Sequence, residues 1–147
     1  MSITKSILTN HFEYKITRNW DRTFWAFDIH GTILKPNYTV GNTPDEFYPL
    51  AIETLQFISK RPDIVMFLYT CSHPNEVDEY LELFKKNDIH FKYVNENPEV
   101  PTQTNGYGCY DKKPYMNVLF EDKAGFDPEN DWGLVLSLLT ANYNGKD

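Results

Sequence analysis

The chain has 147 residues, of which 41% are hydrophobic and 24% charged, and its formal net charge is -7. This length and composition predict one globular domain, because a chain of this size can bury a continuous core. The acidic balance disfavours broad nonspecific binding to nucleic acid, which depends on neutralising many phosphates. It leaves room for a local basic pocket that binds a single phosphate group.

Cysteine content and hydropathy indicate the cellular compartment in which the protein is expected. The two cysteines, Cys71 and Cys109, do not make a disulfide framework. No apolar stretch approaches the length that spans a bilayer, and the N-terminal "MSITKSILTNHFEYK" lacks the sustained apolar segment of a secretory signal. These features predict a cytoplasmic protein with no membrane partner. The sequence leaves the oligomeric state open.

The first half of the chain begins an alternation of strands and helices. The segment "FEYKI" (12–16) predicts an edge strand. The aromatic-rich apolar run 23–29, bounded by charge and then glycine, predicts a buried strand. A helix is predicted over 43–62, because Thr43 can cap it and Pro44 suits its first position. The near-continuous apolar run 63–70 predicts a strand that is buried on both faces.

The second half continues the alternation. The pattern predicts a helix over 73–88, a strand over 89–95, a strand over 115–122 and a helix over 131–143. The segment 96–114 is rich in Pro, Gly and Asn, and predicts a loop. The fold class expected from this order is α/β, a three-layer α/β/α sandwich with a mostly parallel, Rossmann-like central sheet.

Polar side chains follow the predicted strands, at the edge of the sheet where such folds bind ligands. Asp28 and Asp122 end two strands and could converge on one hard cation such as Mg²⁺, which prefers oxygen ligands. An aspartate can also act as a nucleophile and form an acyl-phosphate. The charge on a phosphoryl group calls for a hydroxyl, here Thr70, and an ammonium, here Lys112 or Lys113.

Four short motifs, in order over about residues 24–127, carry a family resemblance. "FDIHGTIL" resembles the first motif of the haloacid dehalogenase-like (HAD) phosphohydrolases, which is usually Asp-x-Asp-Gly-Thr. "FLYTCS" resembles their second motif, an apolar strand that ends in Thr or Ser. "KKPYMNVLFEDKAGFD" resembles the third and fourth motifs together, a lysine followed by an apolar strand and an acidic pair. Each motif is weak alone, and the ordered set is more specific.

The resemblance implies roles for the residues around the predicted nucleophile. Asp28 would be the nucleophile and a Mg²⁺ ligand, and the backbone carbonyl of His30 would be another ligand. Thr70 would hydrogen-bond the phosphoryl group, and Lys113 would neutralise its charge, with Lys112 as the rival assignment.

The resemblance also implies roles for the acidic pair and the turn. Asp122 would be the acidic metal ligand, and Glu121 would accept a hydrogen bond from metal-bound water, a role for which Asp127 is a weaker candidate. Gly31 and Thr32 would shape the turn after the nucleophile. The substrate side of the site is expected to be lined by Gly31, Thr32, Cys71, Ser72 and Lys112.

His30 departs from the family pattern, because the family carries a second aspartate there that protonates the leaving group and then activates water. A histidine can do both in principle, and beside a divalent cation it tends toward its neutral form. A neutral histidine is an acceptable base for water and a poor acid for the leaving group. Three interpretations stay open: an acid/base, a remnant in a fold that only binds phosphate, or a contact to substrate or another metal. A Zn²⁺ site of Cys71, His73 and His30 is one form of the last, although its spacing is not a zinc signature.

The segments between the motifs are too short for an inserted cap domain, so residues 1–147 resemble a single HAD-like domain of the capless kind. The loop 96–111 is the expected specificity element, and its Tyr107 and Tyr110 could stack on a base or sugar. Lys35 is a second candidate for a phosphate contact.

The expected function is Mg²⁺-dependent hydrolysis of a phosphomonoester through an aspartyl-phosphate on Asp28. The alternative is a catalytically weak or inactive phosphoryl-binding module that acts through partners, and a third reading is phosphoryl transfer to an acceptor other than water. The expected ligand is a phosphorylated substrate, namely a nucleotide, a sugar phosphate or a nucleic-acid end.

Overall fold

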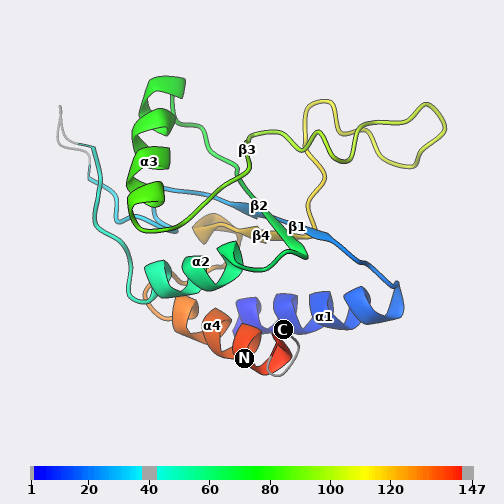
Figure 1. The fold of residues 1–147 in the computed structure, drawn as a ribbon, viewed down its shortest axis with the longest axis horizontal. Coiled ribbons are helices and arrows are strands. Elements are labelled where there is room, and N and C mark those ends of the chain that lie inside the picture. Colours follow the sequence, from blue (N-terminus) through cyan, green and yellow to red (C-terminus); the bar gives the residue numbers. More distant parts are fainter. Residues whose placement is uncertain (1, 38–42, 144–147) are drawn as a thin grey trace.

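The structure is a computed structural model that describes residues 2–37 and 43–143. Its elements, shown in Figure 1, are α1 (Ile3–Thr17), β1 (Thr23–Phe27), α2 (Ala51–Ser59), β2 (Ile64–Leu68), α3 (Pro74–Lys86), β3 (Tyr93–Val94), β4 (Val118–Phe120), the 3₁₀ helix η1 (Asp122–Ala124) and α4 (Asp131–Tyr143).

The four strands form one parallel sheet in the order β3-β2-β1-β4. All residues of β1 and of β2 are buried, as expected for the two inner strands of a sheet that is covered on both faces. β1 is central and pairs with β2 along its whole length, from Thr23 opposite Ile64 to Phe27 opposite Leu68. The predicted α/β class with a parallel central sheet flanked by helices is therefore confirmed, consistent with a three-layer Rossmann-like sandwich.

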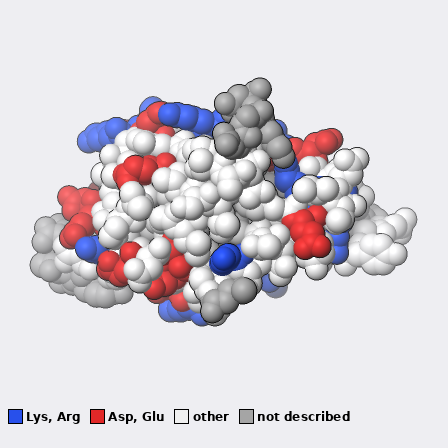
Figure 2. All heavy atoms as spheres, turned by 90° about the horizontal axis from the view of Figure 1, so that it is seen from below, with Lys and Arg blue, Asp and Glu red and all other residues white. Residues whose placement is uncertain are grey.

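Alternate residues of the inner strands face opposite layers of the core. Trp25 and Phe27 belong to the larger cluster, which they share with buried residues of all four helices. In Figure 1, α1, α2 and α4 lie together below the strands, and α4 contacts both of the others. Figure 2 views the molecule from that side, and on the described part of this face acidic and basic side chains are interspersed with uncharged surface.

The second face of the inner strands presents Phe24, Ala26, Val65 and Phe67. The long connection between β3 and β4 covers this face, because its Val100, Tyr115 and Met116 pack against these residues. The same connection then runs outward past the sheet (Figure 1). This segment, predicted as a loop, therefore completes the core as well as bordering the site.

The prediction of an edge strand over 12–16 was wrong, because this segment is the second half of α1. The buried side chains Thr4, Leu8, His11 and Phe12 recur every three to four residues, which is the period of a helix face rather than of a strand. Ser2 caps the helix, and its Oγ accepts a hydrogen bond from the Lys5 N–H at 3.4 Å.

The predicted helix over 43–62 is shortened to α2, residues 51–59. Pro49 disfavours helical geometry at Tyr48, and Leu50 has a left-handed conformation (φ 64°). The preceding residues instead run beside the turn that follows β1, and the Lys35 N–H donates to the Glu46 carbonyl at 2.8 Å. Thr43 does not cap a helix, and its hydroxyl donates to the Glu79 carboxylate.

Among the other predicted elements, α4 has the predicted bounds, and the remaining helix and strands are shorter than predicted. Only residues 93–94 of the predicted strand 89–95 pair with β2, and β4 keeps three residues of the predicted strand 115–122. The last two residues of that range instead leave the strand, and Asp122 begins η1. Among the described residues, no helix is long and apolar enough to cross a membrane.

Candidate functional site

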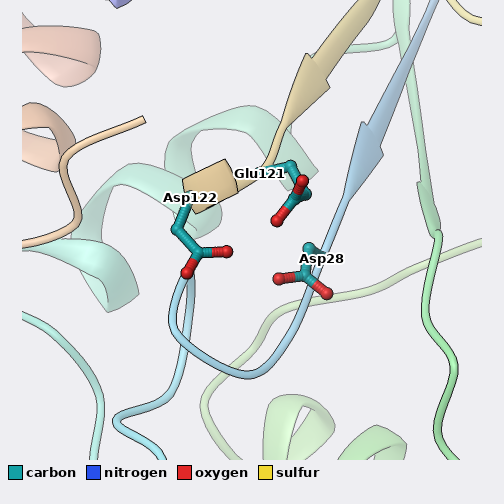
Figure 3. A group of neighbouring side chains, drawn as sticks. All are labelled: Asp28, Glu121 and Asp122. Atoms are coloured by element: carbon teal, nitrogen blue, oxygen red, sulfur yellow. The ribbon is translucent and has the colours of Figure 1, made fainter. Parts of the chain in front are cut away.

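Three carboxylates meet where β1 and β4 end. Because these strands are parallel neighbours, their carboxyl ends lie at one edge, and the Asp28 N–H donates to the Phe120 carbonyl at 3.0 Å. Asp28 follows β1, and Glu121 and Asp122 follow β4. One carboxylate oxygen of each lies within 4.8 Å of the others. Figure 3 shows the three side chains pointing toward a common centre.

Burial and the neighbouring carboxylates act on the pKa of two members of this triad. Burial raises the pKa of Asp28 above its ordinary value, and the neighbouring Asp122 raises it further. Burial likewise raises the pKa of Glu121, with added contributions from Asp122 and Asp28. Three clustered carboxylates repel one another, and a divalent cation between them would relieve that repulsion. An all-oxygen donor set is what Mg²⁺ prefers, so the residues fit this ion.

The turn after β1 holds the carboxylate of Asp28 and the backbone of Asp122. The Thr32 hydroxyl is fully buried, donates to Asp28 Oδ2 at 3.0 Å and accepts from the Asp122 N–H at 3.1 Å. Gly31 has a left-handed conformation (φ 78°), and a Cβ there would lie 2.8 Å from Asp122 Oδ2. The turn therefore needs glycine, both for its backbone angle and for the close approach to Asp122. Gly31 and Thr32 shape the turn, as predicted, and Thr32 also holds the Asp28 carboxylate and the Asp122 backbone.

The triad lies in an open cleft of about 750 Å³. Its lining includes the predicted residues Asp28, His30, Gly31, Thr70, Cys71, Ser72, Lys112, Glu121 and Asp122. Its volume falls within the range of small-molecule sites. The structure thus gathers side chains from the ends of all four strands of the sheet around one open space.

Thr70 is held at the cleft by hydrogen bonds from two directions. The Asn95 side chain accepts from the Thr70 N–H at 2.8 Å and donates to the Thr70 carbonyl at 2.9 Å. The Thr70 hydroxyl accepts from the Ser72 N–H at 3.1 Å and lies 3.0 Å from the Ser72 hydroxyl. Asn95 itself has a left-handed conformation (φ 55°), which turns the chain at the end of β3. This second group of polar side chains faces the same cleft as the carboxylates.

The His30 side chain lines the cleft and contacts two hydroxyls. Its Nε2 lies 3.2 Å from Ser72 Oγ and 3.1 Å from the Tyr80 hydroxyl. Burial raises the pKa of Tyr80, so this hydroxyl keeps its proton and can donate it to Nε2. Tyr80 comes from α3 and was not singled out in the sequence. It lies four residues after Glu76, another lining residue, so the helical period could have placed it on the cleft side.

The lysines divide between the cleft and its surroundings. Lys112 lines the cleft, and Lys113 is not among the lining residues. Lys112, rather than Lys113, can therefore contact a ligand that lies in the cleft. Lys123 also lines the cleft, and the sequence analysis missed it, although it directly follows the acidic pair. Asp127, the weaker candidate to accept a hydrogen bond from metal-bound water, is engaged elsewhere. Its carboxylate accepts hydrogen bonds from the Glu129 N–H and the Asn130 side chain.

The considered Zn²⁺ site is not formed. Among the described residues, three or more side chains that could bind one metal ion come together only in the carboxylate triad. Cys71, His73 and His30 do not belong to that group. His73 instead precedes α3, where its N–H donates to the Glu76 carboxylate at 3.1 Å.

Comparison with known proteins supports the fold and leaves the activity open. No protein-family model matches the chain, and no curated protein matches it. Among solved structures, the chain is similar to a conserved protein from Bacteroides thetaiotaomicron, with a TM-score of 0.60 and 21% sequence identity. The similarity covers 82% of this chain and 92% of that one. At this identity the similarity shows the α/β fold alone.

Proposed function

We propose that this protein is a Mg²⁺-dependent phosphatase that hydrolyses a phosphomonoester through an aspartyl-phosphate on Asp28. The observation that carries the proposal is the carboxylate triad of Asp28, Glu121 and Asp122 beside the hydroxyl of Thr70 and the ammonium of Lys112 in one cleft. The resemblance of the four motifs to the HAD phosphohydrolases supports the same assignment.

The proposed reaction has two steps. An Asp28 oxygen attacks phosphorus, the bond from phosphorus to the ester oxygen breaks, and that oxygen takes up a proton as the alcohol leaves. Water then attacks the phosphoryl group, loses a proton, and releases inorganic phosphate and free Asp28. The Thr70 hydroxyl and the Lys112 ammonium stabilise the charge on the phosphoryl oxygens. Bound Mg²⁺, held by Asp28 and Asp122 with Glu121 beside them, would supply further positive charge.

The activation of water falls to His30. Its ring lines the cleft near the nucleophile, which suits the activation of water. The Tyr80 and Ser72 hydroxyls already engage the Nε2 atom of His30, so this nitrogen is poorly placed to donate a proton to a leaving group. The proposal therefore expects good leaving groups, which depart without a proton, to be hydrolysed faster than alkyl esters.

The contacts of His30 with Ser72 and Tyr80 also favour a second candidate function. With His30 held by Ser72 and Tyr80, the cleft can keep its metal and phosphate geometry while losing most of its turnover. The protein would then act as a phosphoryl-binding module through a partner.

Turnover with p-nitrophenyl phosphate and with an alkyl phosphate, for wild type and His30→Asp, tests both candidates. We expect Mg²⁺-dependent release of p-nitrophenol that EDTA abolishes. Because general acid catalysis contributes at least about 100-fold, His30→Asp should raise alkyl-ester turnover by at least roughly tenfold. No rise on the alkyl ester would contradict the role given to His30, and no turnover with either substrate would favour the binding module.

A further inference from the structure

A second hollow of about 280 Å³ adjoins the cleft, and both share Asn95 and Lys112 in their linings. This hollow, here called the side hollow, is formed by the connection between β3 and β4. Asn95 also hydrogen-bonds the backbone of Thr70, the residue proposed to contact the phosphoryl group. The boundary between the two spaces therefore lies beside the proposed phosphoryl position. A substrate whose phosphate lies in the cleft can therefore extend past Lys112 into the side hollow.

Several contacts tie the side hollow to the sheet. The Tyr110 ring packs edge-on against Tyr115, with ring centroids 5.4 Å apart, and a Cβ at Gly108 would overlap the Tyr110 hydroxyl. The Tyr115 hydroxyl accepts from the Asn117 side chain at 3.0 Å, and Asn117 in turn accepts from the Phe24 N–H of β1 at 2.7 Å. Asn97 is buried and donates to the Tyr115 carbonyl at 2.9 Å, which closes the base of the connection. The shape of the side hollow is thus anchored to the central strand.

The lining of the side hollow combines an aromatic and proline surface with carboxylates. Tyr110 and the prolines at 98, 101 and 114 offer apolar contact area of low flexibility. Glu96 and Asp111 can accept hydrogen bonds from hydroxyl groups. These two carboxylates outnumber the single ammonium of Lys112, so the lining carries a net charge of -1. Such a wall repels a second phosphate and accepts a neutral ring that carries hydroxyls.

We propose that the side hollow binds the leaving group of the substrate, and that this group is an uncharged, hydroxylated ring bearing one phosphate. This inference rests on the proposed function, which places the phosphate in the cleft. A sugar monophosphate and a nucleoside monophosphate share this chemistry. A nucleic-acid end, whose next phosphate would meet Glu96 or Asp111, is a poor fit.

Equilibrium binding in the Asp28→Asn background, with Mg²⁺ present, tests the inference without turnover of the ligands. The probes are two matched pairs, glucose 6-phosphate against glucose 1,6-bisphosphate, and adenosine 5′-monophosphate against adenosine 3′,5′-bisphosphate. In at least one pair the monophosphate should bind roughly tenfold more tightly than the bisphosphate, because of charge repulsion in the side hollow. The pair that shows this preference identifies the sugar or the nucleoside as the leaving group.

Variants assign that preference to the side hollow. Adding Glu96→Gln and Asp111→Asn together should reduce the preference to about threefold or less, because it removes both carboxylates. The matched control is Asp78→Asn with Glu82→Gln, which removes two charges from exposed positions of α3 that do not line either space. The control should keep the full preference.

Equal binding of mono- and bisphosphates, or a preference that both double variants keep, would overturn the inference. Hydrolysis of acetyl phosphate by the wild type, which needs no side hollow, separates this failure from a failure of the proposed function. Turnover of acetyl phosphate without the binding preference refutes the side hollow alone. The binding preference without any turnover refutes hydrolysis and leaves the side hollow standing.

Discussion

Thr32 links the two aspartates of the site through one buried hydroxyl. It donates to Asp28 and accepts from the backbone of Asp122, so it fixes the distance between the ends of β1 and β4. Its own carbonyl accepts from the Trp132 indole at 2.9 Å, which ties the turn to α4. A single side chain thereby couples the site to the core.

Replacing Thr32 with valine keeps the shape of the side chain and removes both of its hydrogen bonds. We expect Thr32→Val to lower the free energy of unfolding by about 1–3 kcal/mol, because the Asp122 N–H loses its buried partner. Mg²⁺ affinity should fall as Asp28 loses its orientation. Chemical denaturation and Mg²⁺ titration measure the two effects. Thr32→Ser, which keeps the hydroxyl, should retain most of both, and an unaffected Mg²⁺ affinity in Thr32→Val would contradict the orienting role.

At the scale of elements, Asp131 fastens α4 to α1. Its carboxylate is buried at the start of α4, and Oδ2 accepts from the Thr4 hydroxyl at 2.7 Å and from the Asp127 N–H at 2.8 Å. A carboxylate in the first turn of a helix is also stabilised by the helix dipole. This contact joins the first turn of α1 to the first turn of α4 below the sheet.

Loss of this fastening should destabilise the fold. Asp131→Asn and Thr4→Val should each lower the free energy of unfolding by about 1–3 kcal/mol, and their combination should cost less than the sum because they share one hydrogen bond. Urea denaturation of the two single variants and the double variant measures the coupling. Ser137→Ala, whose hydroxyl is exposed on α4, should change stability by less than about 0.5 kcal/mol. Fully additive losses would show that the contact contributes nothing.

The sequence predicted the elements whose pattern is strong within a short window. β1 and β2 are continuous apolar runs, and α3 begins at Pro74 with the acidic capping residue Glu76 in its first turn, so local signals were enough. The errors arose where local signals conflicted. The aromatic and β-branched residues of 12–16 favour a strand, and this signal conflicted with the helical spacing of α1. The helix predicted over 43–62 runs through Pro49, and this proline prevents a helix there.

The same limit applies to the candidate site. Strand ends predicted Asp28, Thr70, Glu121 and Asp122 as neighbours, because parallel strands align their carboxyl ends. Tyr80 and the side hollow depend on how α3 and the long connection fold back on the sheet. Those contacts join residues far apart in the chain, and periodicity alone does not specify them.

At the scale of the whole molecule, His11 makes stability depend on pH. It is buried on α1 against the edge of Trp25, and its Nε2 has no hydrogen-bond partner among the described residues. Burial lowers the pKa of His11 from 6.5 to about 4, and the nearby Lys15 lowers it while Asp63 opposes this. The unfolded chain takes up this proton as pH falls through 6.5, and the folded chain does so only near pH 4. The folded state therefore becomes less stable as the pH falls from 6.5 to about 4.

His11→Phe should flatten this dependence, because phenylalanine keeps the aromatic packing and does not titrate. Between pH 6.5 and pH 4, the wild type should lose up to roughly 3 kcal/mol more of its free energy of unfolding than His11→Phe does. Urea denaturation at several pH values measures the difference. Identical pH profiles for wild type and His11→Phe would refute the account of His11.

The central claim concerns Asp28, and steady-state hydrolysis of p-nitrophenyl phosphate with Mg²⁺ by wild type and Asp28→Asn tests it most directly. An asparagine keeps the size of the side chain and replaces the nucleophilic carboxylate with an amide. Measurements of folding and thermal stability serve as the control, because they show whether the variant is intact. The account predicts turnover in the wild type and its complete loss in the folded Asp28→Asn variant. Turnover by Asp28→Asn at the wild-type rate would contradict it.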